Sequence, residues 1–130
     1  MQFFVKGIPT KRRPRFTKQG KAYIDAKTKE EMATIATKYY GEKHEGQVYV
    51  RVDIYPKLPN SAPKKLNDVP AMKKPDVDNV LKVVMDALNG VAYHDDKQVV
   101  QAEVVRHNMQ RMEWDYIVVT VKGIERGKSK

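Results

Sequence analysis

Apolar and polar residues alternate regularly over residues 47–55, "QVYVRVDIY". Successive side chains of a strand point to opposite faces, so this alternation predicts a β-strand with one apolar face. Three further segments are rich in apolar and β-branched residues, and we expect strands at residues 2–8, 99–109 and 114–122. A short polar turn near residues 110–111 joins the last two of them.

Apolar residues recur at helical spacing in two other segments. The first helix is expected to begin at Thr28, where Thr28 and Glu31 have the form of a capping box, and to stop at Gly41. We interpret Tyr39 and Tyr40 on its apolar face as core residues. The second helix follows residue 76 and ends at the Asn-Gly pair of residues 89–90, a common C-terminal stop.

Residues 56–75 interrupt this pattern with prolines and lysines and show no periodicity. A long segment of this kind within a small domain predicts a mobile loop. Both a solvated linker and a flap that contacts DNA agree with its composition. We expect one domain over residues 1–130, with a frayed basic tail at residues 125–130.

The chain is strongly basic, with 25 Lys and Arg against 16 Asp and Glu and a formal net charge of +9. This excess favours a polyanionic partner, and nucleic acid comes first because neutralising phosphates releases counterions. The alternative is that the charge keeps the protein soluble. No long apolar run or basic amphipathic helix indicates a membrane partner.

A basic run before the first helix is broken by proline and glycine, which predicts a loop or an arm. We expect this arm and the end of the 56–75 segment to contact DNA through six side chains: Lys11, Arg12, Arg13, Arg15, Lys73 and Lys74.

The chain has no cysteine, which excludes disulfides, thiolate catalysis and cysteine-type zinc sites. Its three histidines show no metal-ligand spacing. No signal peptide is evident at the N-terminus, so we expect a cytoplasmic protein associated with the nucleoid, or one used in a host cytoplasm.

Aspartates gather at both ends of the second helix, which is unexpected in so basic a chain. Asp76 and Asp78 stand at its start, and Asp95 and Asp96 follow its end by a short loop. Divalent cations such as Mg²⁺ prefer carboxylate oxygens, and segments that fold together can supply them. Lys82 stands one turn after Asp78, where an ammonium can stabilise charge on a phosphate.

Each acid also has a structural interpretation. Asp76 suits an N-cap, and Asp78 suits the positive end of the helix dipole. Asp86 lies four residues after Lys82, and we interpret that pair as a weak surface contact. None of these interpretations explains the second pair of aspartates.

The segment "KPDVDNVLKVVMDALNG", followed by "HDDKQVV", resembles the signature of the RusA family of Holliday-junction resolvases. The basic opening "KGIPTKRRPRF" is also similar to that family, and the resemblance covers about residues 3–121. It implies catalytic roles for Asp76, Asp78, Lys82 and Asp96, with the three aspartates as metal ligands. The role of Asp95 stays open.

The resemblance further implies an α/β fold of the α+β type, with a mixed sheet, two main helices and an intertwined homodimer. It implies an endodeoxyribonuclease that uses Mg²⁺ or Mn²⁺ to resolve four-way junctions by paired symmetric nicks. Such a junction offers two equivalent strands, which a two-fold dimer matches. Flap or fork cleavage by the same site, or DNA binding without catalysis, are the alternatives; a cellular and a phage origin both stay open.

Overall fold

Strand β4 (Val48–Tyr55) lies in the middle of the structure, as its alternating sequence predicts. The apolar side chains of this strand are fully buried: Val48, Val50, Val52 and Ile54. The computed structural model describes residues 1–10, 15–16, 22–23, 26–72 and 76–124.

Four strands form a mixed sheet in the order β1-β6-β4-β5. β1 (Gln2–Lys6) pairs antiparallel with β6 (Tyr116–Gly123), and β6 pairs antiparallel with β4. β5 (Val99–Arg106) runs parallel to β4. Parallel neighbours need a crossover connection, and α2 (Val77–Leu88) provides it. The expected α+β fold with a mixed sheet is therefore confirmed.

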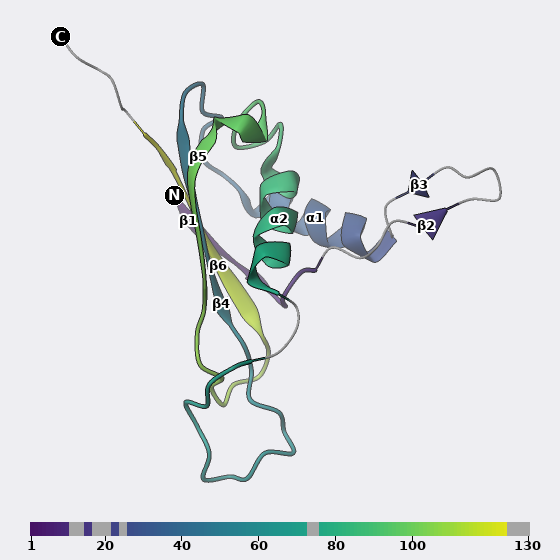
Figure 1. Cartoon of the computed structure of the whole chain (residues 1–130), viewed down its shortest axis with the longest axis vertical. Helices are drawn as coiled ribbons and strands as arrows, with labels where there is room; N and C mark the ends of the chain where they lie inside the picture. Colours follow the sequence, from purple (N-terminus) through teal and green to yellow (C-terminus); the bar gives the residue numbers. More distant parts are fainter. Residues whose placement is uncertain (11–14, 17–21, 24–25, 73–75, 125–130) are drawn as a thin grey trace.

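Both long helices, α1 (Ala26–Lys38) and α2, cover the same face of the sheet (Figure 1). The core lies between this helical layer and the strands. Its fully buried helical residues include Ile35 of α1 and Val80, Val84 and Leu88 of α2. In the described part of the chain, the other face of the sheet has no helix over it.

The start of α1 differs from the sequence-based prediction. The helix begins at Ala26, so Thr28 lies inside it, buried, and is not its N-cap. α1 ends at Lys38, before Gly41. Tyr39 is buried as expected, but Tyr40 is 77% exposed, and its interpretation as a core residue was wrong.

The basic run that was expected to be a loop or an arm contains two very short strands. β2 (Arg15–Phe16) and β3 (Ala22–Tyr23) pair antiparallel, and Figure 1 shows them to one side of the main sheet. β1 and β5 end before their predicted ranges do, at Lys6 and Arg106. β6 begins two residues later and ends one residue later than predicted.

Residues 56–72 contact the turn that joins β5 to β6. The Val69 and Met109 backbones exchange two hydrogen bonds, of 3.0 and 2.6 Å. The Arg111 guanidinium donates to the carbonyl oxygens of Pro63 and Leu66, at 2.7 and 3.1 Å. These bonds hold the described part of the loop against the turn between β5 and β6. Its mobility remains a prediction.

Candidate active site

Three charged side chains stand four residues apart on one side of α2: Asp78, Lys82 and Asp86. Residues at this spacing are neighbours on a helix surface. A rise of about 1.5 Å per residue separates the first from the last by about 12 Å along the axis. Asp78 and Lys82 are exposed, whereas Asp86 is partly buried.

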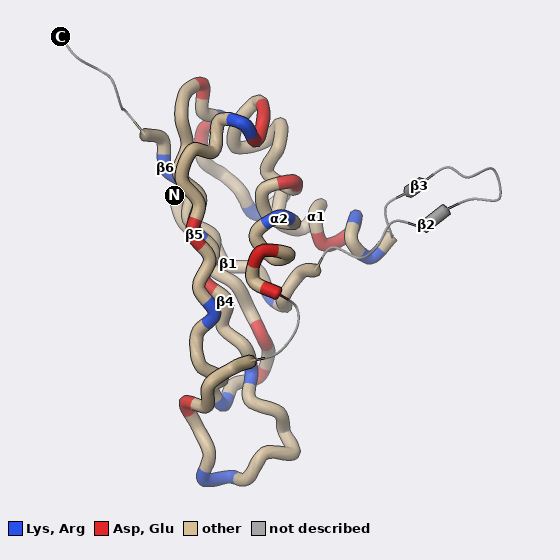
Figure 2. Tube along the Cα trace, in the orientation of Figure 1, with Lys and Arg blue, Asp and Glu red and all other residues tan. Residues whose placement is uncertain are grey.

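A cavity of about 230 Å³ opens along this side of α2. It is lined by Asp78, Leu81, Lys82, Met85, Asp86 and Asp96. Figure 2 shows acidic positions along α2 and in the segment after it, although the chain as a whole is basic. The cavity thus combines three carboxylates with one ammonium over an apolar floor.

Tyr93 brings the segment after α2 back against the helix. Its side chain is fully buried, and its hydroxyl donates to the Met85 carbonyl oxygen at 2.6 Å. Gly90 turns the chain with a φ of 82°, in the left-handed region that favours glycine. Burial, with the charges of Asp96 and Asp86, raises the pKa of Tyr93, so its hydroxyl keeps its proton and stays a donor at neutral pH.

The two adjacent aspartates have different surroundings. Asp95 is the N-cap of the short helix η1 (Asp96–Gln98), and its carboxylate accepts from the Lys97 N–H at 2.9 Å. That hydrogen bond lowers the pKa of Asp95. The Gln98 side chain accepts in return from the Asp95 N–H at 3.0 Å, which completes a capping box. Asp95 is therefore a structural cap, and Asp96 lines the cavity.

Gln98 also ties this segment to the chain just before β4. Its side-chain amide donates to the carbonyl oxygens of His44 and Gly46, both at 2.9 Å. Its carbonyl oxygen accepts from the His94 N–H at 2.7 Å. One glutamine side chain thus ties the backbone of residues 94–95, next to Asp96, to the backbone of residues 44–46. The D-x-x-Q spacing of residues 95–98 was the sequence signal for this cap.

Asp76 is the N-cap of α2, as predicted, but its carboxylate makes no capping hydrogen bond. Its carbonyl oxygen accepts from the Asn79 and Val80 N–H groups, at 3.1 and 3.3 Å. The Asp76 side chain is exposed and does not line the cavity. The structure therefore brings Asp78 and Asp96 to one cavity and leaves Asp76 outside its lining.

Asp86 is the residue that sequence reasoning missed. Its spacing of four from Lys82 was interpreted as a weak surface contact, but the structure places it, partly buried, in the cavity wall. The spacing of eight from Asp78 was the available signal, because it puts both acids on one side of α2.

The spacing of the carboxylates limits how they can hold a cation. Within the described ranges, no three aspartate, glutamate or histidine side chains are close enough to form a metal site. Mg²⁺ nevertheless keeps several waters and commonly uses one or two carboxylates together with substrate phosphates. The carboxylate oxygens of this cavity are the type of ligand that a hydrated Mg²⁺ ion takes, and their separation leaves positions for water.

The predicted DNA contacts lie mostly outside the described residues. This applies to Lys11, Arg12, Arg13, Lys73 and Lys74. Arg15 lies in β2.

The sequence profile of one family, described as endodeoxyribonuclease RusA, matches residues 6–121 of the 130-residue chain. The chain belongs to the RusA family. Membership indicates an endodeoxyribonuclease and implies Holliday-junction resolvase activity, so a DNA-binding role without catalysis is not favoured. The family acts on branched DNA junctions. A search of curated proteins found no match.

No helix in the described part of this RusA-family chain is long and apolar enough to cross a bilayer. RusA-family enzymes generally depend on a divalent metal ion. The cavity on α2, with its carboxylates and lysine, has the side chains that such chemistry needs.

Proposed function

We propose that this protein resolves four-way DNA junctions by divalent-metal-dependent hydrolysis of two symmetric phosphodiester bonds. One observation carries the proposal: Asp78, Lys82 and Asp96, from two separated segments, line a single cavity. Capping already accounts for Asp95, whereas it accounts for none of these three side chains. Family membership supplies the reaction class.

Asp78 and Asp96, which line the cavity, would hold a hydrated Mg²⁺. The family resemblance adds Asp76, which stands at the start of α2 outside the cavity lining. A volume of about 230 Å³ leaves room for water as well as an ion, since one water occupies about 30 Å³ in the liquid. Mn²⁺ takes oxygen ligands too and should replace Mg²⁺. When bound, the ion supplies Lewis-acid stabilisation of the phosphate and lowers the pKa of a coordinated water.

Lys82 is the cation that this chain itself offers to the scissile phosphate. It lies one helical turn from Asp78 and lines the same cavity. A compact ammonium there stabilises the negative charge that develops on the phosphate oxygens. Lys82 would therefore act by its position and charge beside the phosphate.

The basic residues outside the cavity provide affinity for DNA. Lys11, Arg12, Arg13 and Arg15 stand in the basic run, and Lys73 and Lys74 stand a few residues before α2 in the sequence. Phosphates are attracted to these cations and repelled by the acidic cavity until a metal ion neutralises it. The DNA backbone would therefore approach the cavity closely only when a metal ion is bound there.

Paired nicks require two active sites, and we propose that a homodimer supplies them. A four-way junction presents two strands related by two-fold symmetry, which a two-fold dimer matches site for site. The two cuts then fall at symmetric positions, leaving products that can be ligated.

A nicking assay on three substrates tests the proposal. Purified protein is incubated with a synthetic four-way junction, a flap and a fork, with Mg²⁺, with Mn²⁺ or with EDTA, and the cut positions are mapped on each strand. We expect paired symmetric cuts on the junction with either metal and none with EDTA. Faster cleavage of the flap or fork would support the alternative, and cleavage in EDTA would refute metal dependence.

A further inference from the structure

The side-chain amide of Gln98 uses all of its hydrogen-bonding capacity. Its carbonyl oxygen accepts from the His94 and Asp95 N–H groups, at 2.7 and 3.0 Å. Its nitrogen donates to the carbonyl oxygens of His44 and Gly46, both at 2.9 Å. A glutamine amide has two N–H donors and one oxygen with two lone pairs, so these bonds saturate it. A carboxylate cannot reproduce the pattern, because it has no N–H to donate.

Capping alone does not explain this set of bonds. The capping box at η1 needs only one of them from the Gln98 side chain, the bond that it accepts from the Asp95 N–H. The two bonds that Gln98 donates reach carbonyl oxygens 52 and 54 residues earlier in the chain, just before β4. The Gln98 side chain therefore connects η1 to the chain that enters the central strand of the sheet.

Asp96 lies between two residues that are fixed to the rest of the fold. Tyr93, three residues earlier, is bonded to Met85 of α2. Gln98, two residues later, is bonded to the chain before β4. Asp96 itself belongs to η1, a helix of three residues, and so short a helix does not fix its own direction. The position of the Asp96 carboxylate in the cavity wall therefore depends on these two attachments.

We propose that Gln98 is a positioning residue of the candidate active site, which holds the Asp96 carboxylate where a cation in the cavity can use it. Side chains that orient a metal ligand without touching the metal strongly affect metal affinity, because the ligand must be held to within about 0.5 Å. Gln98 does not line the cavity, so it acts through the backbone next to Asp96. The proposal rests on the proposed function, in which Asp96 is a metal ligand.

Titration calorimetry of the full chain with Mn²⁺, in the absence of DNA, measures this effect. Gln98→Ala removes every bond of the amide, whereas Gln98→Glu keeps the acceptor and loses both donors. We expect each variant to bind Mn²⁺ roughly tenfold more weakly than wild type. The direction is decisive for Gln98→Glu, because an added negative charge near the cavity would by itself strengthen cation binding. Gln101→Glu, at an exposed position of β5, adds the same charge and should not weaken binding.

A double-mutant cycle tests whether Gln98 acts through Asp96. If it does, Gln98→Ala weakens Mn²⁺ binding in the wild-type chain but has little further effect in Asp96→Asn, which has already lost the ligand charge. Equal losses of Mn²⁺ affinity in the two backgrounds would overturn the proposal, because Gln98 would then act independently of Asp96.

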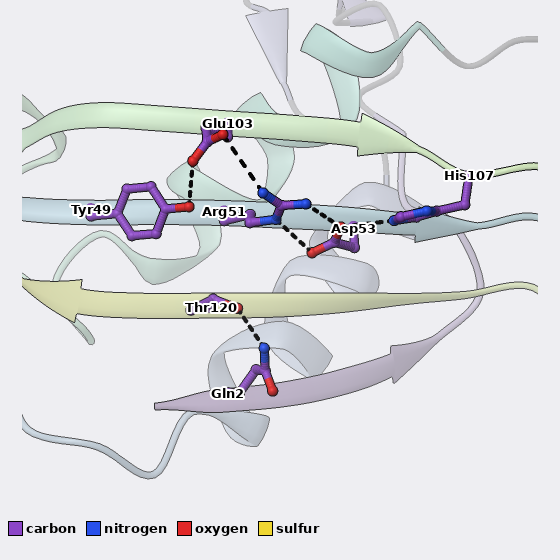
Figure 3. A network of polar contacts seen from close by, with 7 residues as sticks. All are labelled: Gln2, Tyr49, Arg51, Asp53, Glu103, His107 and Thr120. Carbon is purple, nitrogen blue, oxygen red and sulfur yellow. Dashed lines mark hydrogen bonds and ion pairs between the residues drawn. The ribbon is translucent and has the colours of Figure 1, made fainter.

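A polar network far from the cavity provides the control for a purely structural role of Gln98. On the face of the sheet opposite the helices, which we call the uncovered face, Asp53 accepts hydrogen bonds from Arg51 and pairs with His107 (Figure 3). Asp53→Asn should destabilise the chain and leave its Mn²⁺ affinity unchanged. Urea unfolding compares the stability of this variant with that of the Gln98 variants. Folded Gln98 variants that bind Mn²⁺ as tightly as wild type would overturn the proposal and leave Gln98 a structural residue.

Nicking assays separate failure of the positioning role from failure of the proposed function. The Mg²⁺ concentration for half-maximal nicking should rise roughly tenfold in both Gln98 variants, while junction affinity in EDTA stays within about twofold of wild type. If Asp96→Asn binds Mn²⁺ and nicks junctions as wild type does, the proposed function fails at Asp96 and the positioning role fails with it. If Asp96→Asn loses both properties and the Gln98 variants lose neither, the proposed function stands and only the positioning role is overturned.

Discussion

The hydroxyl of Tyr93 donates a 2.6 Å hydrogen bond to the carbonyl oxygen of Met85. This bond joins the two segments that carry the candidate catalytic residues, because Met85 lies in α2 and Tyr93 lies three residues before Asp96. The buried tyrosine thus fixes where Asp96 stands relative to the helix.

We predict that Tyr93→Phe destabilises the protein and slows nicking while leaving the fold intact. The ring keeps its packing, but one buried hydrogen bond is lost, which costs about 1 kcal/mol of unfolding free energy. Urea denaturation measures the stability change. Tyr40→Phe, at an exposed position, is the control and should change neither property. Equal stability of the two variants would show that the 2.6 Å contact contributes nothing.

Asp86→Asn tests the cavity residue that the sequence did not reveal. Removing one negative charge from the cavity wall lowers its attraction for a divalent cation, and we expect Mn²⁺ to bind roughly tenfold more weakly. Titration calorimetry with Mn²⁺ measures this affinity without DNA. Glu113→Gln makes the same charge change at an exposed residue outside the cavity lining and should not alter binding. If Asp86→Asn binds Mn²⁺ as tightly as wild type, Asp86 does not contribute to cation binding and its role is structural.

Lys82→Ala is predicted to reduce the nicking rate by roughly a hundredfold, as loss of one charge-stabilising donor does. Junction affinity should fall far less, because the basic residues outside the cavity supply most of it. Lys82→Arg should not restore the rate, since a planar guanidinium does not replace a compact ammonium in a confined site. Single-turnover nicking and binding titrations on one junction separate the two effects. Equal losses in binding and nicking would make Lys82 a DNA contact instead.

Asp53 on the uncovered face should make stability depend on pH. Hydrogen bonds from Arg51 and His107 lower the pKa of its buried carboxyl. A carboxyl whose pKa is lower in the folded state stabilises the protein above about pH 3.9, the pKa of aspartate in the unfolded chain. This stabilisation is lost as the pH falls through the folded-state pKa.

Asp53→Asn should therefore cost about 1–3 kcal/mol of unfolding free energy at pH 7, and the difference from wild type should shrink below about pH 4. Urea unfolding at pH 7 and pH 3 checks both values. Glu103→Gln, at the more exposed partner of Arg51, is the control and should cost less at pH 7. A difference that persists unchanged at pH 3 would contradict the assignment to charge.

Strong local patterns were sufficient to predict the central elements of the fold. The alternation in β4 and the helical repeat and caps of α2 lie wholly within their own segments. The start of α1 was misplaced because a capping-box pattern at Thr28 also occurs inside a helix. Tyr40 was misjudged because α1 ends at Lys38, so the helical spacing does not continue to residue 40.

The candidate site was predictable in most of its charged members but not in its geometry, since Asp86 was missed and Asp76 lies outside the cavity lining. The aspartates and Lys82 are visible as a spacing pattern, and the structure brings Asp78, Lys82 and Asp96 to one cavity. Asp95 and Asp96 are adjacent residues of the same type, so the sequence does not distinguish their roles. Hydrogen bonds within residues 94–98 make Asp95 the cap of η1. Tyr55 of β4 stacks on Tyr116 of β6, and this contact depends on strand order, which one strand's sequence does not specify.

The most direct test is a parallel binding and nicking assay in Mg²⁺ on one four-way junction. It compares wild type with Asp78→Asn, Asp96→Asn and Asp95→Asn, all checked for folding. We predict that the first two variants lose nicking by at least about a hundredfold and still bind the junction, while Asp95→Asn keeps most of its activity. Nicking at the wild-type rate by both Asp78→Asn and Asp96→Asn would show that the cavity is not the active site.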